Sequence, residues 1–204
     1  MPIPRFYPIL DNDTAVRFGL TVREAAADMI EAGARILQFR HKGLFSREVW
    51  ADLESIAELC RAKDVRLVVN DRADIARLLG AALHLGQEDL APSEARLITG
   101  PTTCIGYSTH NADQLAAARS EPADYLALGP IFGTTSKANP DPVVGLEGLR
   151  RLRPLTDRPL VAIGGITRAN AKSVLDAGAD SVAAIGDLFP DPRKRVSEFL
   201  AAIG

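Results

Sequence analysis

The chain has 204 residues and a mass of 21.8 kDa, which suits one domain with a sizeable core. A formal net charge of −2 argues against a dedicated nucleic-acid-binding protein. No apolar run reaches the ~20 residues of a membrane span, and the amino-terminal residues lack the pattern of a signal peptide. We therefore expect a cytoplasmic protein that binds neither nucleic acid nor membranes, with Cys60 and Cys104 as free thiols.

Apolar runs of strand length recur through the whole chain. They cover residues 6–10, 36–39, 67–69, 83–85, 104–107, 125–128, 160–163 and 181–185. Runs of this length without polar alternation are typical of parallel strands that are buried on both faces.

Segments with helical spacing separate these runs. One begins at the capping box Thr21-Val-Arg-Glu24 and stops at Gly33, and another begins at Ser46. The others cover residues 73–79, 93–98, 111–119, 146–152, 170–177 and 192–203. Eight strands that alternate with eight helices predict an α/β fold, a single-domain (β/α)8 TIM barrel over residues 1–204. A doubly wound open sheet is the alternative, but it usually has fewer strands.

Acidic residues follow the third and fourth predicted strands, at Asp71 and Asp89. Active sites of such barrels lie at the carboxyl ends of the strands, and neighbouring strand ends are about 5 Å apart. Two carboxylates this close repel each other unless a cation lies between them, and Mg²⁺ prefers such oxygen ligands. The alternative is that each aspartate caps the helix that follows it.

Other strand ends carry groups that suit phosphate. Arg40 and Lys42 follow the second strand on one face and suit a diphosphate, although a surface ion pair is the alternative. Asn70 could donate an amide hydrogen bond or form a local turn. His84 alternates with Leu83 and Leu85, so we expect a core histidine inside the barrel.

The loop 129–137 and two glycine turns predict a second anion site. Three hydroxyl residues and a lysine occupy the end of the loop: Thr134, Thr135, Ser136 and Lys137. Gly164-Gly165 and Ile185-Gly186 follow the last two strands, where barrels often bind phosphate through backbone N–H groups. Two anion sites predict two phosphorylated substrates, joined with loss of diphosphate.

Several of these segments, in this order, resemble the thiamine-phosphate synthase family over essentially the whole chain. The matching stretches are residues 38–42, 69–71, 84–89, 105–110, 124–132, 134–137 and 162–166. The resemblance implies a (β/α)8 barrel that joins 4-amino-2-methyl-5-(diphosphooxymethyl)pyrimidine to 4-methyl-5-(2-phosphooxyethyl)thiazole. It also implies a dissociative reaction, in which diphosphate leaves before the thiazole nitrogen captures a pyrimidinylmethyl cation, and one Mg²⁺ per active site.

The resemblance also implies roles for individual residues. The pyrimidine-diphosphate contacts would be Gln38, Phe39, Arg40, His41, Lys42, Asn70, Ser108 and Lys137, of which Arg40, Lys42, Ser108 and Lys137 would be catalytic. The thiazole-phosphate contacts would be Thr134, Thr135, Ser136, Gly165, Ile185 and Gly186. Asp71 and Asp89 would hold the Mg²⁺. The partners would be small phosphorylated molecules, and a homo-oligomer stays open.

Two rival functions share this fold. A thiazole tautomerase-like isomerase lacks the acidic pair, so Asp71 and Asp89 argue against it. A non-catalytic barrel that binds a phosphorylated metabolite would need only the glycine turns after the last two strands, which leaves Arg40, Lys42 and Lys137 unexplained.

Overall fold

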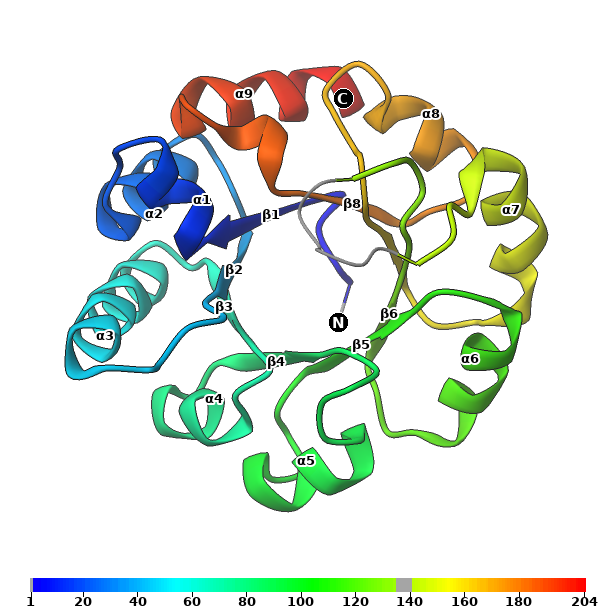
Figure 1. Cartoon of the computed structure of the whole chain (residues 1–204), viewed down its shortest axis with the longest axis horizontal. Coiled ribbons are helices and arrows are strands. Elements are labelled where there is room, and N and C mark those ends of the chain that lie inside the picture. The colour runs from blue at the N-terminus through cyan, green and yellow to red at the C-terminus, as the bar shows by residue number, and fades with distance from the viewer. Residues whose placement is uncertain (1, 135–140) are drawn as a thin grey trace.

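Eight parallel strands close into a barrel in the computed structural model, which describes residues 2–134 and 141–204 (Figure 1). The strands are β1 (Phe6–Asp11), β2 (Ile36–Arg40), β3 (Arg66–Asn70), β4 (Ala82–Leu85), β5 (Ile105–Thr109), β6 (Tyr125–Leu128), β7 (Leu160–Ala162) and β8 (Ser181–Ala184). Each strand pairs with its neighbours in the chain, and β1 pairs with β8. The predicted barrel is confirmed.

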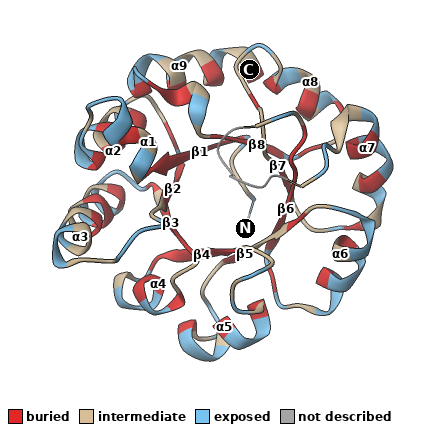
Figure 2. Cartoon of the chain, viewed as in Figure 1, coloured by how far each residue is buried: buried red, intermediate tan, exposed pale blue. Residues whose placement is uncertain are grey.

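Helices surround the barrel and turn their buried faces toward it (Figure 2). They are α1 (Asn12–Arg17), α2 (Val22–Glu31), α3 (Arg47–Ala62), α4 (Ala73–Leu79), α5 (Pro92–Thr99), α6 (Ala112–Ala117), α7 (Gly145–Leu152), α8 (Ala171–Asp176) and α9 (Pro192–Ile203). The described residues also form three short 3₁₀ turns, which are η1 (Ala118–Ser120), η2 (Arg153–Leu155) and η3 (Gly186–Leu188). Within the described ranges, no helix combines the length and hydropathy needed to cross a membrane.

Local sequence explains where several helices begin. Thr21 and Glu24 form the expected capping box of α2, and the Ser46 side chain accepts from the backbone N–H of Val49 at the start of α3. The six-residue helix α1 was not predicted. Its cap is Asp11, the last residue of β1, whose carboxylate accepts from the N–H of Thr14.

Strand alternation divides the core into two parts. Outward-facing side chains such as Leu37, Phe39 and Leu83 pack against the helices in the larger cluster. Inward-facing side chains form a separate interior cluster: Tyr7, Ile9, Ile36, Val68, Ala82, Tyr125, Ala127, Val161 and Ala183. Because successive side chains of a strand point to opposite faces, this parity decides which residues can line a site inside the barrel.

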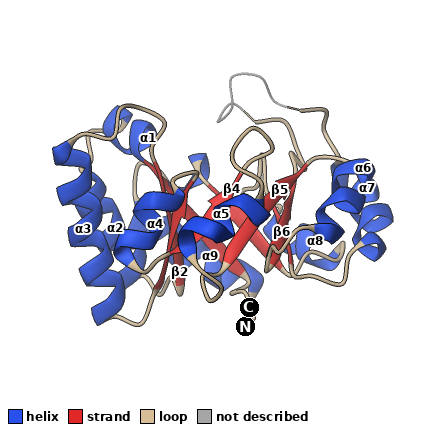
Figure 3. Ribbon diagram, turned by 90° about the horizontal axis from the view of Figure 1, so that it is seen from below, coloured by secondary structure: helices blue, strands red, loops and turns tan. Residues whose placement is uncertain are grey.

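The two ends of the barrel are distinct (Figure 3). Both chain termini lie at one end, and α1, which directly follows β1, lies at the other. The second end therefore collects the carboxyl ends of the strands, where polar residues were predicted. Cys60 and Cys104 are free thiols, as expected.

The interior leaves no room for a side chain at Gly106. A Cβ atom there would lie 2.0 Å from Cζ of the buried Tyr125 ring, so we expect Gly106→Ala to lower the unfolding free energy by about 1–3 kcal/mol through overpacking. Urea unfolding measures this loss. Gly133→Ala is the matched control, because a Cβ at Gly133 meets no atom within 4 Å. Equal stability of Gly106→Ala and wild type would contradict this account of the interior.

Candidate active site

Two carboxylates and a lysine meet at the ends of β2, β3 and β4. The Lys42 ammonium donates to Oδ2 of Asp71 over 2.5 Å. Asp71 adopts left-handed backbone with φ of 64°, and its N–H donates to the carbonyl of His84 over 2.8 Å. Asp89 Oδ2 accepts from the N–H of Gly86 over 2.7 Å. Both aspartates are therefore held by the strand ends.

The surroundings of Asp71 raise the pKa of its carboxyl group to about 6. Burial is the largest cause, and the adjacent Asp89 carboxyl raises the pKa further, whereas Lys42 lowers it. The two carboxyl groups are thus as close as the strand positions predicted. Neither caps a helix, since α4 starts after Arg72 without a side-chain cap and α5 starts after Ala91; the capping alternative is wrong.

This donor set is compatible with a magnesium ion that also binds substrate. Across residues 2–134 and 141–204, no group of three or more His, Cys, Asp or Glu side chains is placed to hold a metal. Mg²⁺ usually keeps several waters and binds one or two carboxylates plus substrate phosphate, and the Asp71 and Asp89 pair would fit that pattern. The buried Nδ2 of Asn70, next to Asp71 in the chain, lacks a hydrogen-bond partner, which a phosphate oxygen could supply.

Arg40, at the end of β2, forms an ion pair with Asp11 at the end of β1. Asp11 Oδ1 also accepts from the N–H and the hydroxyl of Thr14, over 3.0 and 2.6 Å. The carboxylate is buried and therefore orients the guanidinium. Asp11 was not among the predicted site residues, although its place at a strand end is the same signal that singled out Asp71.

A chain of hydrogen bonds crosses the barrel interior below these charges. Gln38 Nε2 donates to the Tyr7 hydroxyl over 2.9 Å, and the hydroxyls of Tyr7 and Tyr125 are 2.8 Å apart. His84 Nδ1 is 3.0 Å from the Tyr125 hydroxyl, and Nε2 is 3.0 Å from Oγ of Ser108. His84 faces the interior as expected, whereas the two tyrosines were not predicted to take part.

The buried His84 imidazole is neutral at neutral pH. Burial lowers its pKa from 6.5 to about 4, although the negative charge of Asp89 opposes that shift. A neutral imidazole can donate from one ring nitrogen and accept at the other, which suits its position between two hydroxyl groups.

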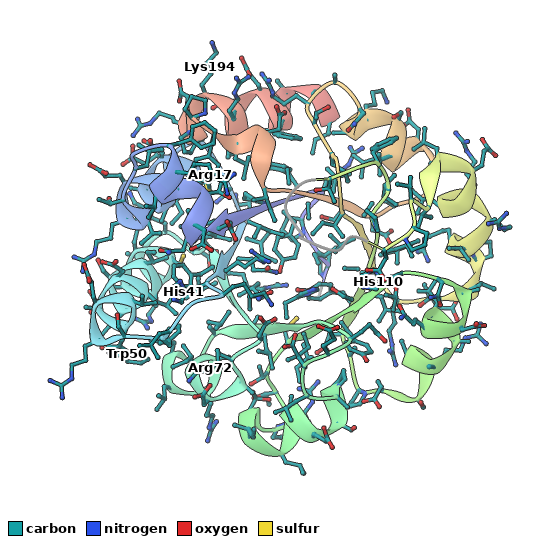
Figure 4. The ribbon with its side chains drawn as sticks, in the orientation of Figure 1. Arg17, His41, Trp50, Arg72, His110 and Lys194 are labelled. Carbon is teal, nitrogen blue, oxygen red and sulfur yellow. The ribbon has the colours of Figure 1, made fainter. Side chains whose placement is uncertain are left out.

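The side chains of two other predicted pyrimidine contacts make their contacts outside the barrel interior. Phe39 packs in the outer core against the helices, so only its backbone can line a site inside the barrel. Nε2 of His41 donates a hydrogen bond to the carbonyl of Leu44 over 3.0 Å, and the ring packs edge-on against Phe45. Figure 4 shows His41 and His110 on opposite sides of the barrel axis.

The structure gives a physical reason for the glycine turn at the predicted thiazole-phosphate site. Gly165 has φ of 63°, and a Cβ there would lie 2.5 Å from the carbonyl oxygen of Gly133, so two loops approach each other closely. His110 Nδ1 donates to the carbonyl of Gly129 over 2.6 Å and ties β5 to the loop after β6.

The other predicted residues of that site are placed only in part. Thr134 and Ile185 are partly buried, and the exposed Gly186 begins η3. Thr135, Ser136 and Lys137 lie outside the described residues. Their roles, like those of the other site residues, stay predictions.

Comparison with known proteins points to one family. A family profile described as thiamine monophosphate synthase matches residues 6–188. The thiamine-phosphate synthase of Koribacter versatilis (strain Ellin345) is 51% identical over 208 residues, which cover 98% of this chain and 96% of that protein. The thiamine-phosphate synthase of Caldicellulosiruptor bescii is 37% identical, over 90% of this chain and 86% of that protein.

A solved structure agrees with the sequence matches. Thiamine phosphate pyrophosphorylase from Pyrococcus furiosus is similar to this chain with a TM-score of 0.86 and 32% sequence identity. The alignment covers 98% of this chain and 95% of that one.

The neutral His84 makes folding depend on pH. The unfolded chain binds the imidazole proton near pH 6.5 but the folded protein only near pH 4, so acid stabilises the unfolded state. We expect this residue to remove about 3 kcal/mol of unfolding free energy between pH 7 and pH 4. Urea unfolding at a series of pH values should show a shallower acid loss in His84→Gln than in wild type. Equal losses would show that His84 is not held neutral.

Proposed function

This chain belongs to the thiamine monophosphate synthase family, and we propose that it is a transferase that makes thiamine phosphate. It would join 4-amino-2-methyl-5-(diphosphooxymethyl)pyrimidine to 4-methyl-5-(2-phosphooxyethyl)thiazole and release diphosphate. The observation that carries this proposal is the meeting of Asp71 and Asp89 with Lys42, beside Arg40, at the carboxyl ends of the strands.

The cations of the site would bind the diphosphate. Arg40 uses Nη1 to contact Asp11, which leaves its other N–H groups for phosphate oxygens, and a guanidinium has five such donors. The Lys42 ammonium likewise keeps donors beyond the one given to Asp71. Each cation can thus hold the substrate without leaving the carboxylate that positions it.

In the reaction, the bond between the pyrimidinylmethyl carbon and the diphosphate oxygen breaks, and the electron pair leaves with diphosphate. The thiazole nitrogen then forms the new C–N bond. Arg40 and Lys42 would stabilise the charge that develops on the leaving group, and the barrel walls would hold the two rings in line. No proton has to be removed from carbon, so a catalytic triad is not required.

Asp71 and Asp89 would hold a magnesium ion. When bound, this ion neutralises part of the negative charge on the departing diphosphate. Its participation is supported by the two adjacent carboxyl groups and by the unpaired, buried Nδ2 of Asn70.

The rival functions have weaker support. The names of the relatives describe synthases, and neither an isomerase nor a binding barrel would explain the pair of carboxylates. A cytoplasmic location and a homo-oligomer stay predictions.

Both products should form together only when both substrates and Mg²⁺ are present. We expect EDTA to abolish formation of thiamine phosphate and diphosphate, and excess Mg²⁺ to restore both. Asp71→Asn and Asp89→Asn keep the shape of each side chain but remove its charge, so each should lower kcat about 10²–10³-fold. Assays of both products measure this.

Asp74→Asn is the matched control. Asp74 pairs with Arg72 on the surface of α4, three residues from Asp71, and its substitution should leave turnover at the wild-type level. Full activity of the Asp71→Asn/Asp89→Asn double variant would refute the metal site, and absence of thiamine phosphate from the wild-type reaction would refute the function.

Arg40→Lys tests the forked contact to diphosphate. Lysine keeps the charge but loses the planar, bidentate donor set, so we expect about a tenfold loss of kcat/KM for the pyrimidine diphosphate. Steady-state kinetics measure the change. Arg47→Lys, at the exposed start of α3, should behave as wild type. An unchanged kcat/KM in Arg40→Lys would show that the fork does not bind this substrate.

A further inference from the structure

The buried hydrogen-bond chain links two residues that face the site. It runs from Gln38 on β2 through Tyr7 on β1, Tyr125 on β6 and His84 on β4 to Ser108 on β5. Tyr7 is 1% exposed and Tyr125 is 2% exposed. Five strands thus contribute one polar group each to a continuous path across the barrel, and water does not compete for the hydroxyls of its two tyrosines.

Only one order of donors and acceptors along this chain gives every buried proton an acceptor. An amide nitrogen donates and does not accept, so the Tyr7 oxygen accepts from Gln38 Nε2. The Tyr7 proton then needs an acceptor of its own. Within the described part of the chain, its other hydrogen-bond partner is the Tyr125 hydroxyl, so Tyr7 donates to Tyr125.

The same count continues to the far end. Tyr125 accepts from Tyr7 and donates its own proton to Nδ1 of His84. A ring nitrogen that accepts carries no proton, so the imidazole proton lies on Nε2, which donates to Oγ of Ser108. In the reverse order the Tyr7 proton would be buried without an acceptor, at a cost large enough to disfavour it.

This order determines what the two ends can offer a ligand. Ser108 accepts from His84, so its own hydroxyl proton is left to be donated into the site. Gln38 uses Nε2 for Tyr7, and no hydrogen bond among the described residues uses its Oε1, which is left as an acceptor. We infer that Tyr7, Tyr125 and His84 act as positioning residues that present an acceptor at Gln38 and a donor at Ser108.

The inferred polarity selects a class of substrate. It fits a heteroaromatic ring that carries an amino group, which would donate to Gln38, and an acceptor atom within reach of Ser108. The 4-aminopyrimidine of the proposed reaction meets this requirement, so the substrate assignment rests on the proposed function. An analogue with a carbonyl oxygen in place of the amino group would set two acceptors against each other at Gln38.

The position of the imidazole proton tests the chain without any substrate. We would label the full-length protein with ¹⁵N-histidine and record long-range ¹H–¹⁵N correlation spectra at pH 7.5, with His84 assigned by its loss in His84→Gln. Wild type should show His84 as a single tautomer with the proton on Nε2. Tyr125→Phe removes the donor to Nδ1 and should yield a mixture of both tautomers.

Tyr107→Phe is the matched control for this experiment. Tyr107 lies on β5 beside Ser108, but its hydroxyl is not part of the chain, so His84 should keep the wild-type tautomer. Tyr7→Phe removes the hydroxyl that joins Gln38 to Tyr125. It serves as a second variant if Tyr125→Phe does not fold. A wild-type proton on Nδ1 would overturn the inferred polarity.

Kinetics test whether the tyrosine acts through Ser108. We expect Tyr125→Phe and Ser108→Ala each to lower kcat/KM about tenfold, the effect of one hydrogen bond. The double variant should lose less than the product of the two single losses, because Ser108 is one of the two groups that Tyr125 positions. Additive losses would overturn the positioning role. Absence of synthase activity in wild type would refute the proposed function, whereas the tautomer would still decide the polarity.

Discussion

Closure of the parallel sheet is the constraint on which the rest of the structure depends. Each strand pairs with two neighbours in register, which brings Asp11 beside Arg40 and Asn70 beside His84. Alternation along every strand then assigns each side chain either to the helices or to the interior. A group of polar residues from different strands can therefore share one end of the barrel without any of them being close in sequence.

Ion pairs stabilise the charged side chains at this end of the barrel before any substrate binds. Asp11 holds Arg40, and Asp71 holds Lys42, so each cation has a carboxylate neighbour. The second carboxylate, Asp89, has no such cation of its own among the ion pairs of the described residues, and its proximity helps to raise the pKa of Asp71 to about 6, after the larger effect of burial. This excess of negative charge supports the proposed magnesium site.

The interior below the charges is polar in a different way. Two tyrosines, a glutamine and a histidine are buried there, and hydrogen bonds join all of them. Burying such groups is unfavourable unless they are paired. Because every buried proton needs an acceptor, the order of donors and acceptors along the chain has a single direction. The fold thus places a neutral set of hydrogen-bonded donors and acceptors beside the charged residues at the strand ends, an arrangement that suits the proposed reaction between two phosphorylated aromatic substrates.

Local patterns in the sequence were sufficient for the strands, most of the helices and the acidic pair, because apolar runs, caps and strand ends are short-range signals. They missed α1, because its cap, Asp11, is also the last residue of a strand. They also could not reveal the hydrogen bond between the hydroxyls of Tyr7 and Tyr125, which are 118 positions apart, or the one between Tyr125 and His84. Those features depend on the register and parity of a closed barrel, so only the tertiary structure decided them.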